Sequence, residues 1–146
     1  MQKTDWQHLI PHRGAMCLLD EVVDWDATRI HARTLSHRDA ANPLRSDGRL
    51  RSVHLCEYGA QAMALHGGLL AQRDGAVAAP GLLVSLRAVK LERARIDDLP
   101  DALDVRAEQL LAAAGGWQYA FEISCGDLAL ASGRAAVMLL DSGQSG

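Results

Sequence analysis

A long, mostly apolar stretch at residues 52–72, SVHLCEYGAQAMALHGGLLAQ, most constrains the fold of this chain. Its apolar residues cover more than one face of a helix, so we expect other structure to wrap it. Ser52 is placed to cap the first free backbone N–H groups. Small residues such as Gly59 and Ala60 allow a sheet to approach the helix axis closely. The stretch therefore predicts a buried central helix.

Glu57 is the only carboxylate within this stretch. Burying an unpaired charge is costly, so two interpretations are open. In the first, the helix turns Glu57 toward solvent. In the second, a functional site uses the carboxyl group.

Strand patterns flank the predicted helix on both sides. Residues 16–25 are β-rich and residues 29–36 alternate between apolar and polar, and a polar loop at 37–51 separates them from the helix. After the helix, three or four further strands are predicted, at residues 81–91, 102–113, 117–125 and 128–140; residues 102–113 could also be helix, and their place among hairpin-like signals favours a strand. An antiparallel sheet wrapped around one long helix satisfies this order, which is an α+β arrangement. We expect one domain over residues 1–140 and a disordered tail over 141–146.

Composition argues against several classes of protein. The net charge is −3 without a basic tract, and aromatic residues make up only 4%, so nucleic-acid binding is not expected. No apolar run approaches the roughly 20 residues that a membrane-spanning helix needs, and the N-terminus has no signal-peptide core. We therefore expect a cytoplasmic protein that does not interact with membranes.

The cysteines and histidines do not form a recognisable site motif. Cys17, Cys56 and Cys125 are far apart and lie in apolar runs, which is typical of buried thiols. The six histidines show no spacing typical of metal ligands. Neither a metal ion nor a cofactor is expected.

Two motifs resemble the hot-dog fold 3-hydroxyacyl-[acyl-carrier-protein] dehydratases. Ile10-Pro11-His12-Arg13, followed by MCLLDEV at residues 16–22, is similar to that family's L-P-H-R-x-P-x-L-L-V-D-R-V opening. Glu57-Tyr58-Gly59-Ala60-Gln61 is similar to its E-A-M-A-Q on the central helix. The Asn42-Pro43-Leu44 and E-Y-x-A-Q patterns look most like the branch associated with aryl-polyene and xanthomonadin-type pigment pathways. The resemblance covers most of the chain and implies a hot-dog fold, with the sheet wrapped around the helix.

One departure from the family concerns its catalytic histidine. The family carries this residue in a G-H-F-P-G loop, fourteen residues before the helix glutamate. Counting back from Glu57 places Pro43 at that position. The usual base is therefore absent from its usual place.

The resemblance implies a dehydration reaction, which needs a base for the C2 proton and an acid for the leaving C3 hydroxyl. Glu57 suits the acid role, because burial among apolar neighbours favours the protonated form of a carboxyl group. Backbone N–H groups near Ser52 and Val53 are expected to bind the thioester carbonyl at the helix N-terminus. Gln61, from the same motif, is a further expected substrate contact. An acyl chain would lie between the helix and residues 81–91.

Several sources for the missing base remain open. His12 is retained from the opening motif, although a structural role is the alternative reading for it. His37 lies near the loop, and His54 precedes Glu57 by three residues, so that both could share one helical face. A partner hot-dog subunit is the remaining source, because in this family each site combines residues of two subunits.

The expected partners are an acyl carrier protein with its phosphopantetheine-linked acyl chain and a second hot-dog subunit, in a homodimer or a heterodimer. Two groups of basic residues suit an acidic carrier and its phosphate: Arg45, Arg49 and Arg51 before the helix, and Arg87, Lys90, Arg93 and Arg95 after it. Ordinary solvated charge explains each of them equally well. Two rival functions remain: a hot-dog acyl thioesterase, and a non-catalytic subunit that binds carrier protein.

Overall fold

The structure is a computed structural model that describes residues 1–76, 81–113 and 115–139. The expected tail at 141–146 and the end of the predicted domain at residue 140 lie outside this described part. No described helix is long and apolar enough to cross a lipid bilayer.

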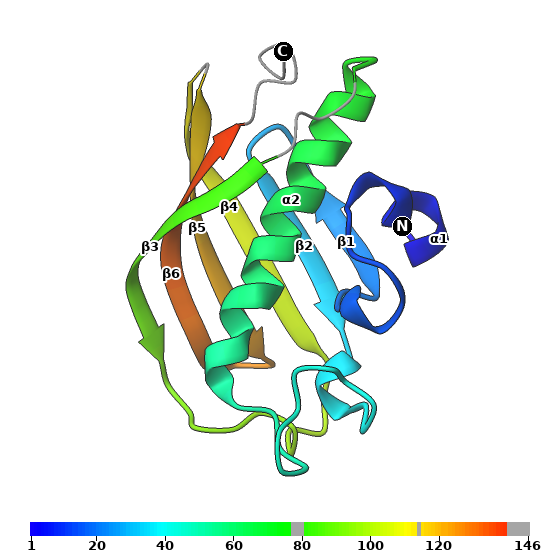
Figure 1. Cartoon of the computed structure of the whole chain (residues 1–146), viewed down its shortest axis with the longest axis vertical. Coiled ribbons are helices and arrows are strands. Elements are labelled where there is room, and N and C mark those ends of the chain that lie inside the picture. The colour runs from blue at the N-terminus through cyan, green and yellow to red at the C-terminus, as the bar shows by residue number, and fades with distance from the viewer. Residues whose placement is uncertain (77–80, 114, 140–146) are drawn as a thin grey trace.

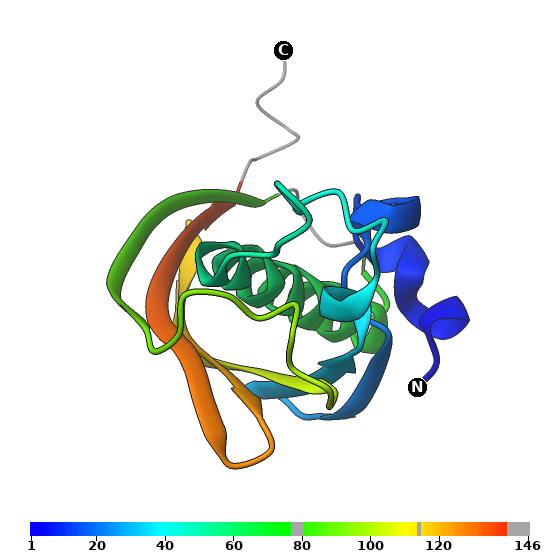
Figure 2. The ribbon, with the colours of Figure 1, turned by 90° about the horizontal axis from the view of Figure 1, so that it is seen from below.

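The helix α2 (Leu55–Arg73) lies across the concave face of one antiparallel sheet (Figure 1). The sheet has six strands in the order β1-β2-β4-β5-β6-β3. Their bounds are β1 Glu21–Trp25, β2 Arg29–Thr34, β3 Gly81–Leu91, β4 Leu103–Ala113, β5 Gly116–Cys125 and β6 Leu128–Leu139. Viewed along the helix from below, the sheet curls around it (Figure 2). This arrangement confirms the predicted hot-dog fold.

The core lies between α2 and the middle of the sheet. Leu55, Tyr58 and Leu65 on the helix are completely buried, as are Val105 and Ile123 on β4 and β5. Alternate residues of each strand face the helix, as the two-residue period of a strand requires. Burial of this apolar surface is the main favourable contribution to folding.

The close approach of helix and sheet depends on Gly59. A Cβ atom added at Gly59 would lie 2.8 Å from Cδ2 of Phe121 on β5. The prediction that small residues admit the sheet at this point is therefore supported by the packing of a specific aromatic ring against the helix backbone.

The sheet wraps α2 as predicted, but one side of the helix is not covered by the described residues. Val53, just before the helix, is 55% exposed, and Ala64 is exposed as well. The helix packs on β4, β2, β5 and β6. An apolar helix face is therefore open to a partner or a ligand.

The segment before β1 differs from its prediction as a strand. Only Glu21–Trp25 forms β1, while Gly14–Met16 forms a 3₁₀ turn. The intervening peptide of Leu18 is engaged by side chains instead of a neighbouring strand: its N–H donates to Gln61, and its carbonyl accepts from Ser36 and Thr34. These contacts tie residues 16–18 to α2, and the strand cannot begin until they end.

The start of the helix also differs from the prediction. Ser52–His54 forms a 3₁₀ turn, and His54 is the N-cap residue of α2, without a side-chain capping bond. Ser52 is buried, and its backbone N–H donates to the carbonyl of Ala94 at 3.1 Å. Ser52 therefore joins the helix entry to the segment after β3 instead of capping the helix.

Candidate active site

The N-terminal segment and α2 bring His12 and Glu57 together. Nε2 of His12 lies 3.4 Å from Oε1 of Glu57. The two side chains are 25% and 39% exposed, so solvent still reaches the pair. The expectation that Glu57 sits in a dry environment is therefore not met within the single chain.

His12 has an asymmetric environment. Its Nε2 faces Glu57, whereas its Nδ1 is buried and has no hydrogen-bond partner among the described residues. Arg13 keeps the backbone on either side of the imidazole in place, because its guanidinium donates to the carbonyls of Ile10 and His12. Arg13 thus holds the backbone that carries His12.

Gln61 holds the segment that carries His12. Its Nε2 donates to the carbonyl of Met16 at 2.7 Å, and its Oε1 accepts from the N–H of Leu18 at 2.9 Å. The side chain is completely buried, and both ends of its amide are engaged. The structure therefore gives Gln61 a positioning role, one turn of helix after Glu57, in place of the expected contact with substrate.

Tyr58 ties the same segment to the loop before the helix. Ser36 Oγ donates to the carbonyl of Leu18, so the Tyr58 hydroxyl donates to Ser36 Oγ at 2.9 Å. Asn42 Nδ2 in turn donates to the Tyr58 hydroxyl at 3.1 Å and to the carbonyl of Ser36. Burial raises the pKa of Tyr58, which keeps its phenol neutral and able to donate.

The loop at the position of the family histidine is therefore structural in this chain. Asn42 is buried and Pro43 is exposed. The Asn42 side chain bonds three groups at once, because its Oδ1 also accepts from the N–H of Leu44. The pairing of Asn42 with Tyr58 was missed from the sequence; both residues stand in the motifs that mark this branch, which was the available signal.

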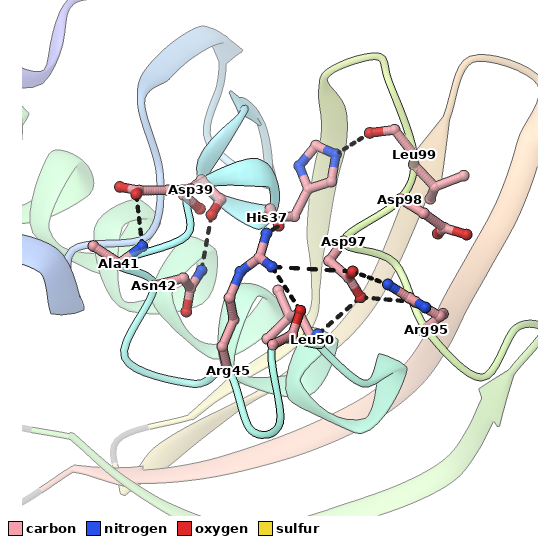
Figure 3. Close-up of polar contacts among 12 residues, drawn as sticks. His37, Asp39, Ala41, Asn42, Arg45, Leu50, Arg95, Asp97, Asp98 and Leu99 are labelled. Atoms are coloured by element: carbon pink, nitrogen blue, oxygen red, sulfur yellow. Dashed lines mark hydrogen bonds and ion pairs between the residues drawn. The ribbon is translucent and has the colours of Figure 1, made fainter.

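A second set of contacts fixes the entry to the helix (Figure 3). The carboxylate of Asp97 accepts from the N–H of Leu50 at 2.8 Å and is bound by the guanidinium of Arg95. Arg45 lies 4.0 Å from the same carboxylate and donates to the carbonyl of His37. The hydrogen bond from Arg95 holds the pKa of Asp97 well below its usual value. The loop 37–51 and the turn at 95–98 are thereby joined.

The other two candidate histidines occupy different positions in the fold. His37 is buried, its Nε2 lies 3.0 Å from the carbonyl of Leu99, and desolvation lowers its pKa. His54 is the N-cap residue of α2, and neither histidine forms an ion pair with Glu57 in the part of the chain that the structure describes. Of the histidines considered as the base, His12 is the one placed beside the carboxylate.

Ser52 and Val53, the expected substrate contacts at the helix start, differ in whether they are free to bind a ligand. The N–H of Ser52 is engaged by Ala94, whereas Val53 presents an exposed side chain on the open side of the helix.

Within the described residues, no three or more His, Cys, Asp or Glu side chains are grouped so that they could bind a metal ion.

A protein-family model described as ApeP dehydratase matches residues 4–145 of the chain. The chain belongs to the ApeP-like dehydratase family. This assignment agrees with the resemblance of the Ile10 to Arg13 and Glu57 to Gln61 motifs. No curated protein matches this ApeP-like chain.

Solved structures share the fold of this ApeP-like chain. The dehydratase heterocomplex ApeI:P from Xenorhabdus doucetiae matches with a TM-score of 0.84 and 24% identity, over 94% of this chain and 92% of that chain. A hypothetical thioesterase with coenzyme A from Streptococcus pneumoniae matches with a TM-score of 0.61 and 12% identity, over 82% and 84%. AziG of S. sahachiroi matches with a TM-score of 0.60 and 16% identity, over 82% and 90%. At these identities the matches establish the hot-dog fold.

Proposed function

We propose that this chain catalyses the dehydration of 3-hydroxyacyl thioesters on an acyl carrier protein, as one subunit of a heteromeric dehydratase. The observation that carries the proposal is the 3.4 Å separation of His12 Nε2 and Glu57 Oε1. An imidazole and a carboxyl group are the base and acid that this elimination needs. Membership of a dehydratase family supports the reaction class.

In the proposed reaction, Nε2 of His12 takes the C2 proton of the substrate. The electron pair of the C2–H bond forms the C2=C3 double bond, the C3–O bond breaks, and the hydroxyl group leaves as water with a proton from Glu57. The products are a 2-enoyl thioester and water. The imidazolium then returns its proton to the Glu57 carboxylate across their short separation, which restores both groups.

The open apolar side of α2 is the proposed binding surface for the acyl chain. Val53, Ala60 and Ala64 are partly or fully exposed there, on the same side as Glu57. On β3, the side chains of Leu86 and Val89 are also exposed, with exposed fractions of 40% and 39%. A second subunit that covers this side would exclude water from the reacting groups, which strengthens their electrostatic interactions. The solved ApeI:P structure is a heterocomplex, which supports a partner of the same fold.

Only part of the expected basic surface is available to a carrier protein. Arg45 is bound inside the loop contacts, Arg95 is held by Asp97, and Arg93 is paired with Asp98 at 3.0 Å. Arg49, Arg51, Arg87 and Lys90 are exposed. We therefore assign any contact with the carrier phosphate to these four residues.

The test measures formation of the conjugated 2-enoyl thioester from a 3-hydroxyacyl carrier substrate, with and without candidate partner subunits. Glu57→Gln and His12→Asn should each lower the rate by about 10²–10⁴-fold, the usual contribution of a positioned acid or base. His8→Asn and Glu122→Gln are matched controls, because both wild-type side chains are exposed and away from the pair. These control variants should keep the wild-type rate.

The other outcomes separate the rival functions. Release of free thiol without a 2-enoyl product would identify a thioesterase. An active complex whose rate is unchanged by Glu57→Gln and His12→Asn would make this chain a non-catalytic subunit. Full activity of the purified chain alone would remove the need for a partner.

A further inference from the structure

The β4–β5 hairpin ends in an apolar tip. Residues 110–116, LLAAAGG, include no polar side chain. Leu110 lies in a register shift of β4, and Leu110 and its neighbour Leu111 are 44% and 55% exposed. Hairpin turns usually carry polar residues, as do the turns at 26–28 and 126–127 of this chain, which each contain an aspartate. The tip of the β4–β5 hairpin departs from this rule.

The apolar surface continues onto the neighbouring strands at the same end of the sheet. Gly116 of the hairpin pairs with Met138 of β6, whose side chain is 49% exposed. Val137, the residue before Met138, pairs with Leu83 of β3, and Leu83 and Val84 are 40% and 49% exposed. The hairpin reaches past the ends of β3 and β6 (Figure 1). A group of exposed large apolar side chains at one end of the molecule indicates an interaction surface.

No charge interrupts this apolar end. The strand segments that form it contain no charged residue: 81–86, 109–118 and 135–139. The two strands of the hairpin remain paired up to Ala113 and Gly116. Moving the tip out of water therefore buries neither a charge nor a row of unpaired peptide groups, the two costs that normally oppose such a transfer.

Positive charge without a counter-charge lies behind the apolar end. Arg87 of β3 and Arg134 of β6 stand opposite each other, and neither forms an ion pair within the described residues. Arg134 precedes Met138 by four residues, which is about 13 Å along an extended strand. On β4, the acid nearest to the tip is Glu108, which is already paired with Arg29 at 3.5 Å. The charge behind the apolar end is therefore positive on β3 and β6 and neutralised on β4.

We propose that this end of the sheet binds the surface of a membrane that contains anionic lipids. Leu110, Leu111 and Met138 enter the outer part of the acyl-chain region, and Arg87 and Arg134 contact the headgroup phosphates. Apolar protein surfaces bound in this way are buried by about 5–10 Å, which leaves arginines about 13 Å behind the tip at the level of the headgroups. A fluid lipid layer surrounds both faces of a projecting hairpin, whereas a protein partner would need a matching cleft. Contact with one leaflet needs neither a spanning helix nor a signal segment, the two features whose absence led to the expectation of no membrane interaction.

Vesicle flotation with the full-length chain tests the proposal. The vesicles contain phosphatidylcholine alone or an equal mixture with phosphatidylglycerol, which is anionic. We expect the wild type to float with the anionic vesicles, and higher salt to weaken its binding. Leu110→Ser combined with Leu111→Ser should lower the partition coefficient at least about tenfold, because less apolar area is removed from water. Arg134→Gln should lower it about fivefold, the usual contribution of one basic residue near an anionic membrane.

Leu128→Ser is the matched control, because this leucine is 46% exposed beside the β5–β6 turn, at the opposite end of the sheet. This variant should bind vesicles as the wild type does, and circular dichroism melting checks that every variant is folded. Absence of flotation with both kinds of vesicle, or equal binding by the wild type and the double leucine variant, would overturn the proposal. Self-association of the wild type that the double leucine variant abolishes, measured by sedimentation velocity, would identify an interface between copies and would overturn it as well. No substrate is present, so these results do not bear on the dehydratase proposal, and loss of dehydration in the earlier test leaves this inference unchanged.

Discussion

His66 lies in the middle of α2 with no solvent exposure and a partner at each ring nitrogen. Its Nε2 is 2.9 Å from the carbonyl of Asp26, and its Nδ1 is 2.8 Å from the hydroxyl of Tyr119. A carbonyl only accepts, so Nε2 carries the proton and Nδ1 accepts from Tyr119. Burial lowers the pKa of His66 and raises that of Tyr119, which keeps both groups neutral.

Removing the Tyr119 hydroxyl leaves Nδ1 of His66 buried without a donor. We expect Tyr119→Phe to lower the free energy of unfolding by about 1–3 kcal/mol, the usual cost of an unsatisfied buried polar atom. Urea denaturation measures the change. In a double-mutant cycle with His66→Gln, the two losses should not add, because each single change already breaks the bond. Additive losses would show that the two side chains contribute independently.

At the scale of elements, the contact between the N-terminal segment and α2 depends on Gln61. Its side-chain amide is the link between the helix and the peptides of Met16 and Leu18. The segment that it holds continues back to His12, so the position of the imidazole relative to Glu57 depends on a residue whose side chain bonds to neither of the two side chains.

We expect Gln61→Leu to leave the N–H of Leu18 and the carbonyl of Met16 unsatisfied, at a cost of about 1–3 kcal/mol. Hydrogen exchange at the Leu18 amide should accelerate, because local opening of this segment becomes easier. The Thr28 amide, which donates to Asp26 Oδ1 at 2.8 Å, is an internal control that should not change. Unchanged protection at Leu18 would show that the segment is held by other contacts.

At the scale of the whole molecule, two buried histidines couple stability to pH. Desolvation lowers the pKa of both His37 and His66 from the usual value of 6.5. The unfolded chain then binds more protons than the folded chain below about pH 6.5, since its histidines titrate normally. The stabilising contribution is therefore complete above this pH and is lost as the pH falls toward the folded-state values.

We expect the free energy of unfolding to decrease as the pH is lowered from about 7 to 5, by at most about 1.4 kcal/mol per pH unit for each histidine. Denaturation at a series of pH values measures this slope. His37→Gln should make the slope shallower, whereas His8→Gln, at an exposed position, should leave it unchanged. A slope that stays the same in the His37 variant would contradict the prediction.

The motifs in the sequence predicted the fold and one pair of residues. The apolar stretch around Tyr58 and the alternating strands were sufficient for an antiparallel sheet around one helix, because these patterns are local, and the resemblance of the motifs to a family identified this arrangement as the hot-dog fold. The choice of Glu57 and His12 came from motifs rather than from geometry, and the structure brings the two side chains together. Their chemical roles remain predictions.

Local patterns did not predict contacts between segments that are distant in sequence. The apolar content of residues 16–25 resembled a strand, yet side chains from Gln61 and Ser36 bind the Leu18 peptide. Ser52 is the type of residue that caps helices, but its N–H pairs with Ala94, 42 residues further along the chain. In both cases a long-range hydrogen bond outweighed the local preference.

The sequence by itself determined the order of the main helix and strands but not all of their bounds, because hydrophobic period and turn residues act over a few positions. Only the tertiary structure decided which polar side chains meet, such as His12 with Glu57 and Asn42 with Tyr58. Such pairings depend on strand register and on how segments that are distant in the sequence pack against one another. Single-residue properties do not encode either of these.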